Sequence, residues 1–131
     1  KKNQPSLLYQ HICMMVKQFL NTDGEERLYL SCDFETTYVS SLKDSAKARK
    51  ENIFLLIGFL DLLMLYGRNA LEGRTEGPLW FQKAIEDCRY SKNQLVDLLA
   101  VSCEQMDRCN RYNDLGLVFY QTLFRSKECN L

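Results

Sequence analysis

Residues that interrupt helices are scarce in this sequence. Proline occurs only at Pro5 and Pro78, and four of the six glycines lie at Gly24 or within residues 67–77. Proline and glycine are the strongest local breakers of secondary structure, so the segments between them are long and uninterrupted. Long segments favour helices, and the breaks offer no support for a strand-rich fold. The sequence therefore predicts an all-α protein.

The sequence also has no net charge, because 17 Lys and Arg balance 17 Asp and Glu. This balance argues against a general nucleic-acid-binding protein, which is held on phosphates by a basic surface. A local basic patch is still present, since the densest basic cluster comprises Lys43, Lys47, Arg49 and Lys50. Such a cluster fits an acidic partner or RNA phosphate, and it equally fits a solvated helix end.

The residue patterns of catalytic, nucleotide and metal sites are missing. The one histidine, His11, is two residues from Cys13, so the two side chains face different sides of a helix and cannot act as a base and its nucleophile. The glycines within residues 67–77 are not followed by G-K-[ST], the mark of a phosphate loop. Cys103 and Cys109, the tightest cysteine pair, make a poor chelate at six residues apart. We therefore predict a protein that is not an enzyme, with no cofactor and no metal.

No segment has the pattern of a membrane span. The longest apolar run, residues 53–66, is about fourteen residues long and contains Asp61, whereas a span needs about twenty residues. We interpret the run as a buried core helix with Asp61 on its narrow exposed stripe. The chain starts at Lys1 without a Met or an apolar signal stretch. We therefore expect residues 1–131 to form a single helical domain cut from a longer protein.

Six cysteines occur, at positions 13, 32, 88, 103, 109 and 129. An even number could form disulfides in a secreted protein, and a secreted four-helix cytokine-like ligand is one alternative. Most of these cysteines, however, occupy apolar positions of helical patterns, where a thiol acts as a small hydrophobe. The sequence also has no N-x-Ser/Thr sequon. We favour free thiols in a reducing compartment, which predicts a cytoplasmic or nuclear protein.

Apolar periodicity predicts six helices. The first three run from about Pro5 to Asn21, from after Gly24 to Leu42 and from Ser45 to Tyr66. A polar loop is expected at residues 67–77, and the remaining helices cover about 79–88, 91–106 and 115–123. Six helices with short connections make three antiparallel pairs, which stack as a solenoid or close into a compact bundle.

Side-chain signals mark the starts of the last three helices. Pro78 suits a first helical turn, where its missing N–H costs nothing. Ser91 to Gln94 fits a capping box, in which two side chains satisfy backbone donors. Asn113 or Asp114 can cap the sixth helix. Trp80 follows Pro78 closely and is expected to pack in the core against the neighbouring helical pair.

Three of the predicted helices resemble a known family. Residues Ala48 to Leu63 resemble the long central helix of the middle domain of eukaryotic translation initiation factor 4G, in which basic residues precede an apolar run containing a glycine. Leu28 to Tyr38 is similar to the helix before it, and Leu95 to Met106 to the capped helix after it. The likeness extends over roughly residues 7–124 and is nearest to the poly(A)-binding-protein-interacting protein type.

The resemblance implies a HEAT-like stack of antiparallel helical pairs that binds other proteins. It corresponds to the C-terminal three helical pairs of the family's domain, without its N-terminal part. The family implies a non-catalytic adaptor in mRNA translation or RNA metabolism whose partner is a DEAD-box RNA helicase or another RNA-bound factor. Helix ends rich in Arg and Tyr make good anchors for a partner. The candidate contacts are Arg108, Arg111, Tyr112 and Asn113. An RNA-binding helical module is a further alternative.

Overall fold

The computed structural model describes residues 7–22, 26, 46–109 and 115–128. Every element of secondary structure longer than a turn in these ranges is a helix, which confirms the all-α prediction for this part of the chain. The helices are α1 (Leu7–Leu20), α3 (Ala46–Glu72), α4 (Leu79–Glu86), α5 (Lys92–Cys109) and α6 (Leu115–Glu128). The predicted helix from after Gly24 to Leu42 lies outside the described residues except for Glu26. The expected number of six helices is therefore untested.

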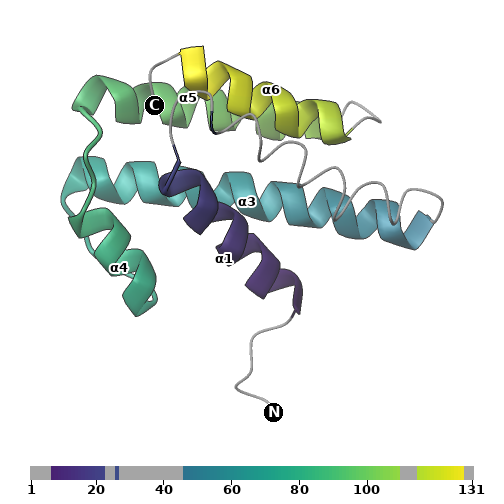
Figure 1. Ribbon diagram of the computed structural model, residues 1–131, viewed down its shortest axis with the longest axis horizontal. Helices are drawn as coiled ribbons and strands as arrows, with labels where there is room; N and C mark the ends of the chain where they lie inside the picture. The colour runs from purple at the N-terminus through teal and green to yellow at the C-terminus, as the bar shows by residue number, and fades with distance from the viewer. Residues whose placement is uncertain (1–6, 23–25, 27–45, 110–114, 129–131) are drawn as a thin grey trace.

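The long helix α3 is the centre of the fold and contacts each of the other four described helices. Its 27 residues correspond to a length of about 40 Å at 1.5 Å per residue. Helices α5 and α6 lie along one side of α3, with α5 antiparallel to both of its neighbours, whereas α1 crosses α3 obliquely and α4 lies near the C-terminal end of α3 (Figure 1). The helices therefore form one cluster around a single central element.

The hydrophobic core lies where α1, α5 and α6 meet α3. Its largest fully buried apolar side chains are Val16, Phe19, Leu56, Phe59, Leu60, Leu63, Phe81, Leu98, Val118 and Leu123. Phe19 of α1 packs edge to face on Phe59 of α3, with their ring centroids 5.9 Å apart. Full burial of an apolar side chain of this size contributes on the order of 1.5–3 kcal/mol. These contacts are what hold α1 on α3.

The predicted loop at residues 67–77 is wrong in its first half, because α3 continues to Glu72. Gly67 is buried inside the helix, where an added Cβ would lie 3.2 Å from Leu99 of α5. This glycine is thus a point of close helix approach and not a helix end. Directly after the helix lies Gly73, whose φ of 73° suits a residue without a Cβ. The Arg74 N–H donates to the Asn69 carbonyl at 2.9 Å, which closes the last turn.

The extension of α3 also corrects the estimate of about fourteen apolar residues. By length and composition alone, Ile53–Glu72 is long and apolar enough to cross a membrane, and 44% of its most apolar part is buried in the structure. A buried core helix meets the same two criteria. Burial against α1, α5 and α6 is the environment that the structure gives α3.

The predicted start signals of α4 and α5 are found close to their expected places. Pro78 is the N-cap of α4, one position before the first helical turn, and its carbonyl accepts from the N–H groups of Phe81 and Gln82 at 3.0 Å. The capping box of α5 is confirmed, because Gln94 N–H donates to Ser91 Oγ at 3.1 Å and Ser91 N–H donates to Gln94 Oε1 at 2.8 Å. The residues expected to cap α6 lie outside the described residues.

Helices α5 and α6 bury polar as well as apolar side chains. The fully or nearly fully buried ones are Ser102, Gln105, Thr122 and Ser126. The hydroxyls of Thr122 and Ser126 donate to carbonyls of their own helix, at 2.9 and 2.8 Å. The polar side-chain atoms of Ser102 and Gln105 have no hydrogen-bond partner among the residues that the structure describes. Cys103 is exposed, whereas its neighbour Ser102 is buried.

Candidate functional site

One stripe of α3 is exposed and is not covered by any described helix. Phe54, Asp61, Leu65 and Arg68 recur every three to seven residues and are all exposed, which is the spacing of one helix stripe. Half of Phe54 and 41% of Leu65 are accessible to solvent. The expected exposure of Asp61 is confirmed. A helix apolar on nearly every face thus leaves part of its apolar surface for contacts outside the described core.

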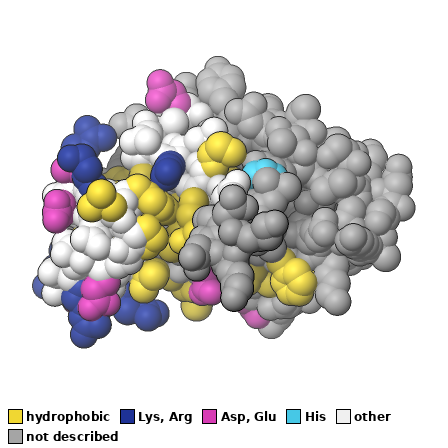
Figure 2. Space-filling model, turned by 90° about the horizontal axis from the view of Figure 1, so that it is seen from below, with side chains coloured by type: hydrophobic (Ala, Val, Ile, Leu, Met, Phe, Trp, Pro, Cys, Tyr) yellow, Lys and Arg dark blue, Asp and Glu magenta, His cyan; other side chains and the backbone are white. Residues whose placement is uncertain are grey.

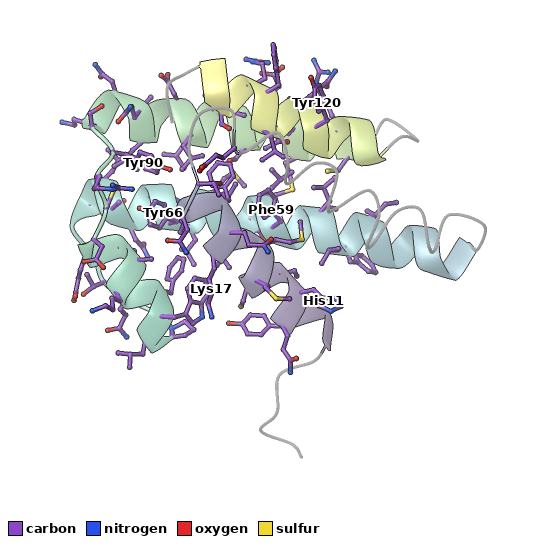
Figure 3. All side chains as sticks on the ribbon, viewed as in Figure 1. His11, Lys17, Phe59, Tyr66, Tyr90 and Tyr120 are labelled. Atoms are coloured by element: carbon purple, nitrogen blue, oxygen red, sulfur yellow. The ribbon has the colours of Figure 1, made fainter. Side chains whose placement is uncertain are left out.

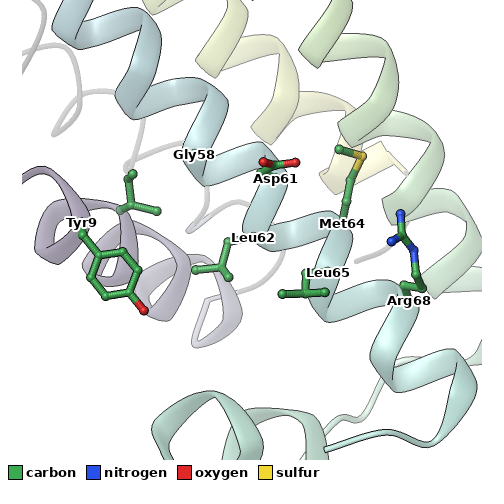
Figure 4. Close-up of a pocket in the computed structure, with 8 residues that line it drawn as sticks. Tyr9, Gly58, Asp61, Leu62, Met64, Leu65 and Arg68 are labelled. Atoms are coloured by element: carbon green, nitrogen blue, oxygen red, sulfur yellow. The ribbon is translucent and has the colours of Figure 1, made fainter. Parts of the chain in front are cut away.

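Helix α1 flanks this stripe and forms a groove of about 390 Å³ with it (Figure 4). The residues lining the groove are Tyr9, Ile12, Gly58, Asp61, Leu62, Met64, Leu65 and Arg68. In Figure 4, Leu62 and Leu65 extend from α3 toward the side on which Tyr9 lies. The groove is therefore an apolar channel with walls from two helices.

Gly58 determines how closely α1 approaches α3 beside the groove. A Cβ at this position would collide with the Ile12 side chain of α1. Because glycine has no Cβ, Ile12 packs directly on the backbone of α3 at this point. Because of this close contact, the exposed side chain of Tyr9, one turn earlier on α1, lies beside the stripe and forms one wall of the groove.

Two opposite charges stand along the groove. Asp61 and Arg68 are both exposed and are seven residues apart, which is about two turns or 10.5 Å along a helix. Within the ranges that the structure describes, neither side chain forms an ion pair. Leu65 lies between them in the sequence, so the stripe presents an apolar centre with a carboxylate on one side and a guanidinium on the other.

A second hollow, of about 410 Å³, lies between α1 and α4. It is lined by Tyr9, Gln10, His11, Cys13, Met14, Lys17 and Trp80. Lys17 Nζ is 4.9 Å from the centroid of the Trp80 ring, close enough for a cation–π contact, and Figure 3 places Lys17 in the space between the two helices. Trp80 is half-buried against the core, so its predicted packing role is partly met, and one part of it remains a wall of this hollow.

His11 and Cys13, which are two residues apart on α1, both line this second hollow. Cys13 is buried, and its side chain is hydrogen-bonded to Tyr9 one turn earlier. This hydrogen bond, together with burial, raises the pKa of Tyr9 above its ordinary value. The Cys13 thiol is therefore engaged with a phenol.

The face of the molecule turned toward the viewer in Figure 2 has exposed apolar side chains in its described part. Seen from this side, hydrophobic side chains gather near the centre, and basic and acidic side chains lie at the edges (Figure 2). Exposed apolar patches of this kind on a protein surface mark interaction sites. The arrangement of an apolar centre with a charged rim is also typical of protein–protein interfaces.

Arg108, one of the predicted partner contacts, joins α5 to α6. Its guanidinium donates to Gln121 Oε1 at 2.8 Å and to Glu104 Oε2 at 3.3 Å. Arg125 of α6 donates to the same Glu104 oxygen at 3.1 Å. Arg125, followed by Arg108, lowers the pKa of the Glu104 carboxyl. The structure thus gives Arg108 a role inside the fold, and its role toward a partner stays a prediction.

The other predicted contacts are not brought together by the described structure. Lys43, Arg111, Tyr112 and Asn113 lie outside the described residues. Lys47, Arg49 and Lys50 belong to the first turns of α3, where only the helical backbone is described. The proposed contact of these residues with a partner stays a prediction.

The described residues offer few groups for covalent or metal chemistry. Within them, no cluster of three or more His, Cys, Asp or Glu side chains has the spacing to hold a metal ion. Cys13, Cys88, Cys103 and Cys109 are free thiols, and burial raises the pKa of Cys109 to about 11. Such a thiol is protonated at neutral pH and is a poor nucleophile. Cys32 and Cys129 lie outside the described residues.

Comparison with known proteins identifies no relative: no protein-family model, no curated protein and no solved structure matches this chain. The resemblance to the initiation-factor middle domain therefore stays a prediction. The groove itself was not predicted from the sequence. The position of Asp61 could have indicated the groove, because residues one or two turns from an exposed charge lie on the same exposed stripe of the helix. Two such residues of α3, Phe54 and Leu65, are large and apolar.

Proposed function

We propose that this protein is a non-catalytic protein-binding adaptor whose groove between α1 and α3 takes up the apolar face of a partner helix. The observation that carries this proposal is the groove itself, with exposed Tyr9 and Leu65 on its walls and the charges of Asp61 and Arg68 beside it. Amphipathic helices bind proteins by laying their apolar face in such grooves. The charges would fix the direction in which the partner helix lies.

The class of adaptor follows from the family resemblance. The likeness of Ala48 to Leu63 to the initiation-factor helix supports a HEAT-like stack of helical pairs. It also supports a cytoplasmic role in mRNA translation or RNA metabolism, through docking of a DEAD-box helicase or another RNA-bound factor. An adaptor needs a second binding surface besides the groove. The basic positions of early α3 and the α5–α6 junction are our candidates for it, and protein binding ranks above RNA binding there because the net charge is zero.

The test compares two variants that introduce the same charge at exposed apolar positions. Leu65→Asp places a carboxylate in the groove, and Val96→Asp places one on α5, where Val96 is 51% exposed and lines neither hollow. Chains bearing each change are used to capture proteins from lysate treated with nuclease, and the retained proteins are identified by mass spectrometry. Cross-linking then maps the bound segment.

The proposal expects wild type and Val96→Asp to retain the same partner, cross-linked to α1 and α3, and Leu65→Asp to lose it. An apolar anchor at the centre of an interface is where truncation or charge insertion costs most. Equal retention by all three chains would show that the groove is not the binding surface. Recovery of proteins only when RNA is intact would replace protein binding by RNA binding.

A further inference from the structure

The charge pattern along the groove is complementary to itself. Asp61 and Arg68 have opposite charges, and Met64 and Leu65 lie midway between them. If two copies of α3 pack antiparallel about a two-fold axis at this midpoint, Asp61 of each copy meets Arg68 of the other. The same axis brings Leu65 of one copy beside Met64 and Leu65 of the other. A two-fold interface requires just such a self-complementary surface.

We propose that the helix taken up beside α1 is α3 of a second copy of this chain, held antiparallel by two reciprocal Asp61–Arg68 ion pairs around a Leu65 centre. This inference rests on the proposed function, since it uses the same groove as the binding surface. The second copy is chosen as the occupant because Asp61 and Arg68 form no ion pair within the described residues and can therefore pair with each other between two copies.

The antiparallel arrangement is the one that the charges allow. In a parallel pair in register, Asp61 would face Asp61 and Arg68 would face Arg68, so like charges would oppose one another at both ends of the contact. In the antiparallel pair, both ends are attractive and the apolar centre is shielded from water.

The flanking residues extend the same contact. Phe54 is 50% exposed and continues the apolar stripe two turns before Asp61, so in the antiparallel pair it reaches toward the C-terminal end of the second α3. Tyr9 of α1 borders the groove on one side. Two copies would therefore cover each other's exposed Leu65 and Tyr9 side chains at once. The dimer would leave α5 and α6 uncovered, which gives the adaptor two copies of every other binding surface.

Charge reversal provides the decisive experiment. Arg at position 61 faces Arg68 of the second copy, and Asp at position 68 faces Asp61, so Asp61→Arg and Arg68→Asp each replace two attractions by two repulsions. Each variant alone should self-associate about tenfold or more weakly than wild type in sedimentation equilibrium. Mixed together, the two variants should pair with each other, because both contacts between unlike chains are attractive again. Tagged Asp61→Arg should then retain untagged Arg68→Asp.

Asp97→Arg is the matched control, because Asp97 is exposed on α5 and outside the groove. It should associate as wild type does. Circular dichroism checks that each variant is folded, which we expect because Asp61 and Arg68 are exposed. The mixing step detects pairing by a gain of signal, which an unfolded variant cannot produce.

Two results would overturn the second copy as occupant: wild type that stays monomeric at every concentration tested, or single variants that fail to pair when mixed. Monomeric wild type together with loss of a different partner on Leu65→Asp would leave the proposed function standing and reject the dimer alone. A dimer that forms unchanged with Leu65→Asp would reject the second copy as occupant of the groove. Retention of the captured partner by the same variant would reject the proposed function as well.

Discussion

At the scale of single residues, Gln105 stands out because it is fully buried and both polar atoms of its amide lack a hydrogen-bond partner within the described part of the chain. A buried polar group left unpaired costs about 1–3 kcal/mol. Gln94 provides a contrast on the same helix, since its amide oxygen accepts from Ser91 N–H in the capping box. The two glutamines therefore have opposite effects on the stability of α5.

We predict that Gln105→Met, which nearly conserves side-chain volume, raises the free energy of unfolding by about 1 kcal/mol. The same change at the cap, Gln94→Met, should lower it, by roughly 0.5–1 kcal/mol. Urea denaturation at neutral pH measures both. A decrease with Gln105→Met would mean that a buried partner of the Gln105 amide exists.

At the scale of elements, the α5–α6 pair is joined by Glu104, which accepts from Arg108 and Arg125. The two guanidiniums lower the pKa of Glu104 in the folded state below its ordinary value of 4.5. A carboxyl with a depressed folded pKa stabilises the fold above its unfolded pKa, and this contribution is lost as the pH falls through the folded pKa. The side chain is 41% exposed, so solvent screening keeps the effect small.

We predict that Glu104→Gln lowers the melting temperature slightly at pH 7, and that the difference from wild type shrinks as the pH falls below 4.5. The expected loss at neutral pH is below about 1 kcal/mol, as for other exposed ion pairs. Thermal melts from pH 7 down to acid measure the difference. Glu86→Gln is the control, because Glu86 is an exposed acid of α4 outside this network. A difference that grows toward acid pH would contradict the prediction.

The elements also show what sequence could and could not predict. Local signals worked where local chemistry decides, as in the Ser91 capping box and the exposed Asp61. They failed at Gly67, because the sequence alone does not distinguish a glycine that ends a helix from a glycine that allows two helices to pack closely. The contact with Leu99 of α5 shows that Gly67 is of the second kind. The groove depends in the same way on Ile12 meeting Gly58 from a different helix. Its lining residues could be assigned only when α1 and α3 were positioned together.

At the scale of the whole molecule, α3 is the one described helix that all the others contact. The side chains on the buried side of α3 therefore form the core with the other helices, and side chains on its exposed side line the groove. Phe59 and Phe54 make this division testable, because they lie on the same helix and differ only in environment: Phe59 is fully buried and packs on Phe19, whereas half of Phe54 is exposed.

We predict that Phe59→Ala destabilises the protein by about 3–5 kcal/mol, a large part of a typical total of about 5–15 kcal/mol. Because α3 links the other helices, helicity should be lost in a single transition at a much lower temperature. Phe54→Ala, measured at low protein concentration, should change stability by less than about 1 kcal/mol. Similar losses for the two variants would show that the two faces of α3 do not differ in this way.

Trp80 is the only tryptophan in the chain, and its ring lies beneath the ammonium group of Lys17, which belongs to α1. The protein therefore has a built-in optical reporter at the joint between its first helix and α4. If α1 separated from α4, the Lys17 ammonium group would leave the Trp80 ring and water would reach the indole, which would shift the fluorescence emission of Trp80. Such a shift at unchanged circular dichroism would distinguish undocking of one helix from unfolding of the whole, without any added label.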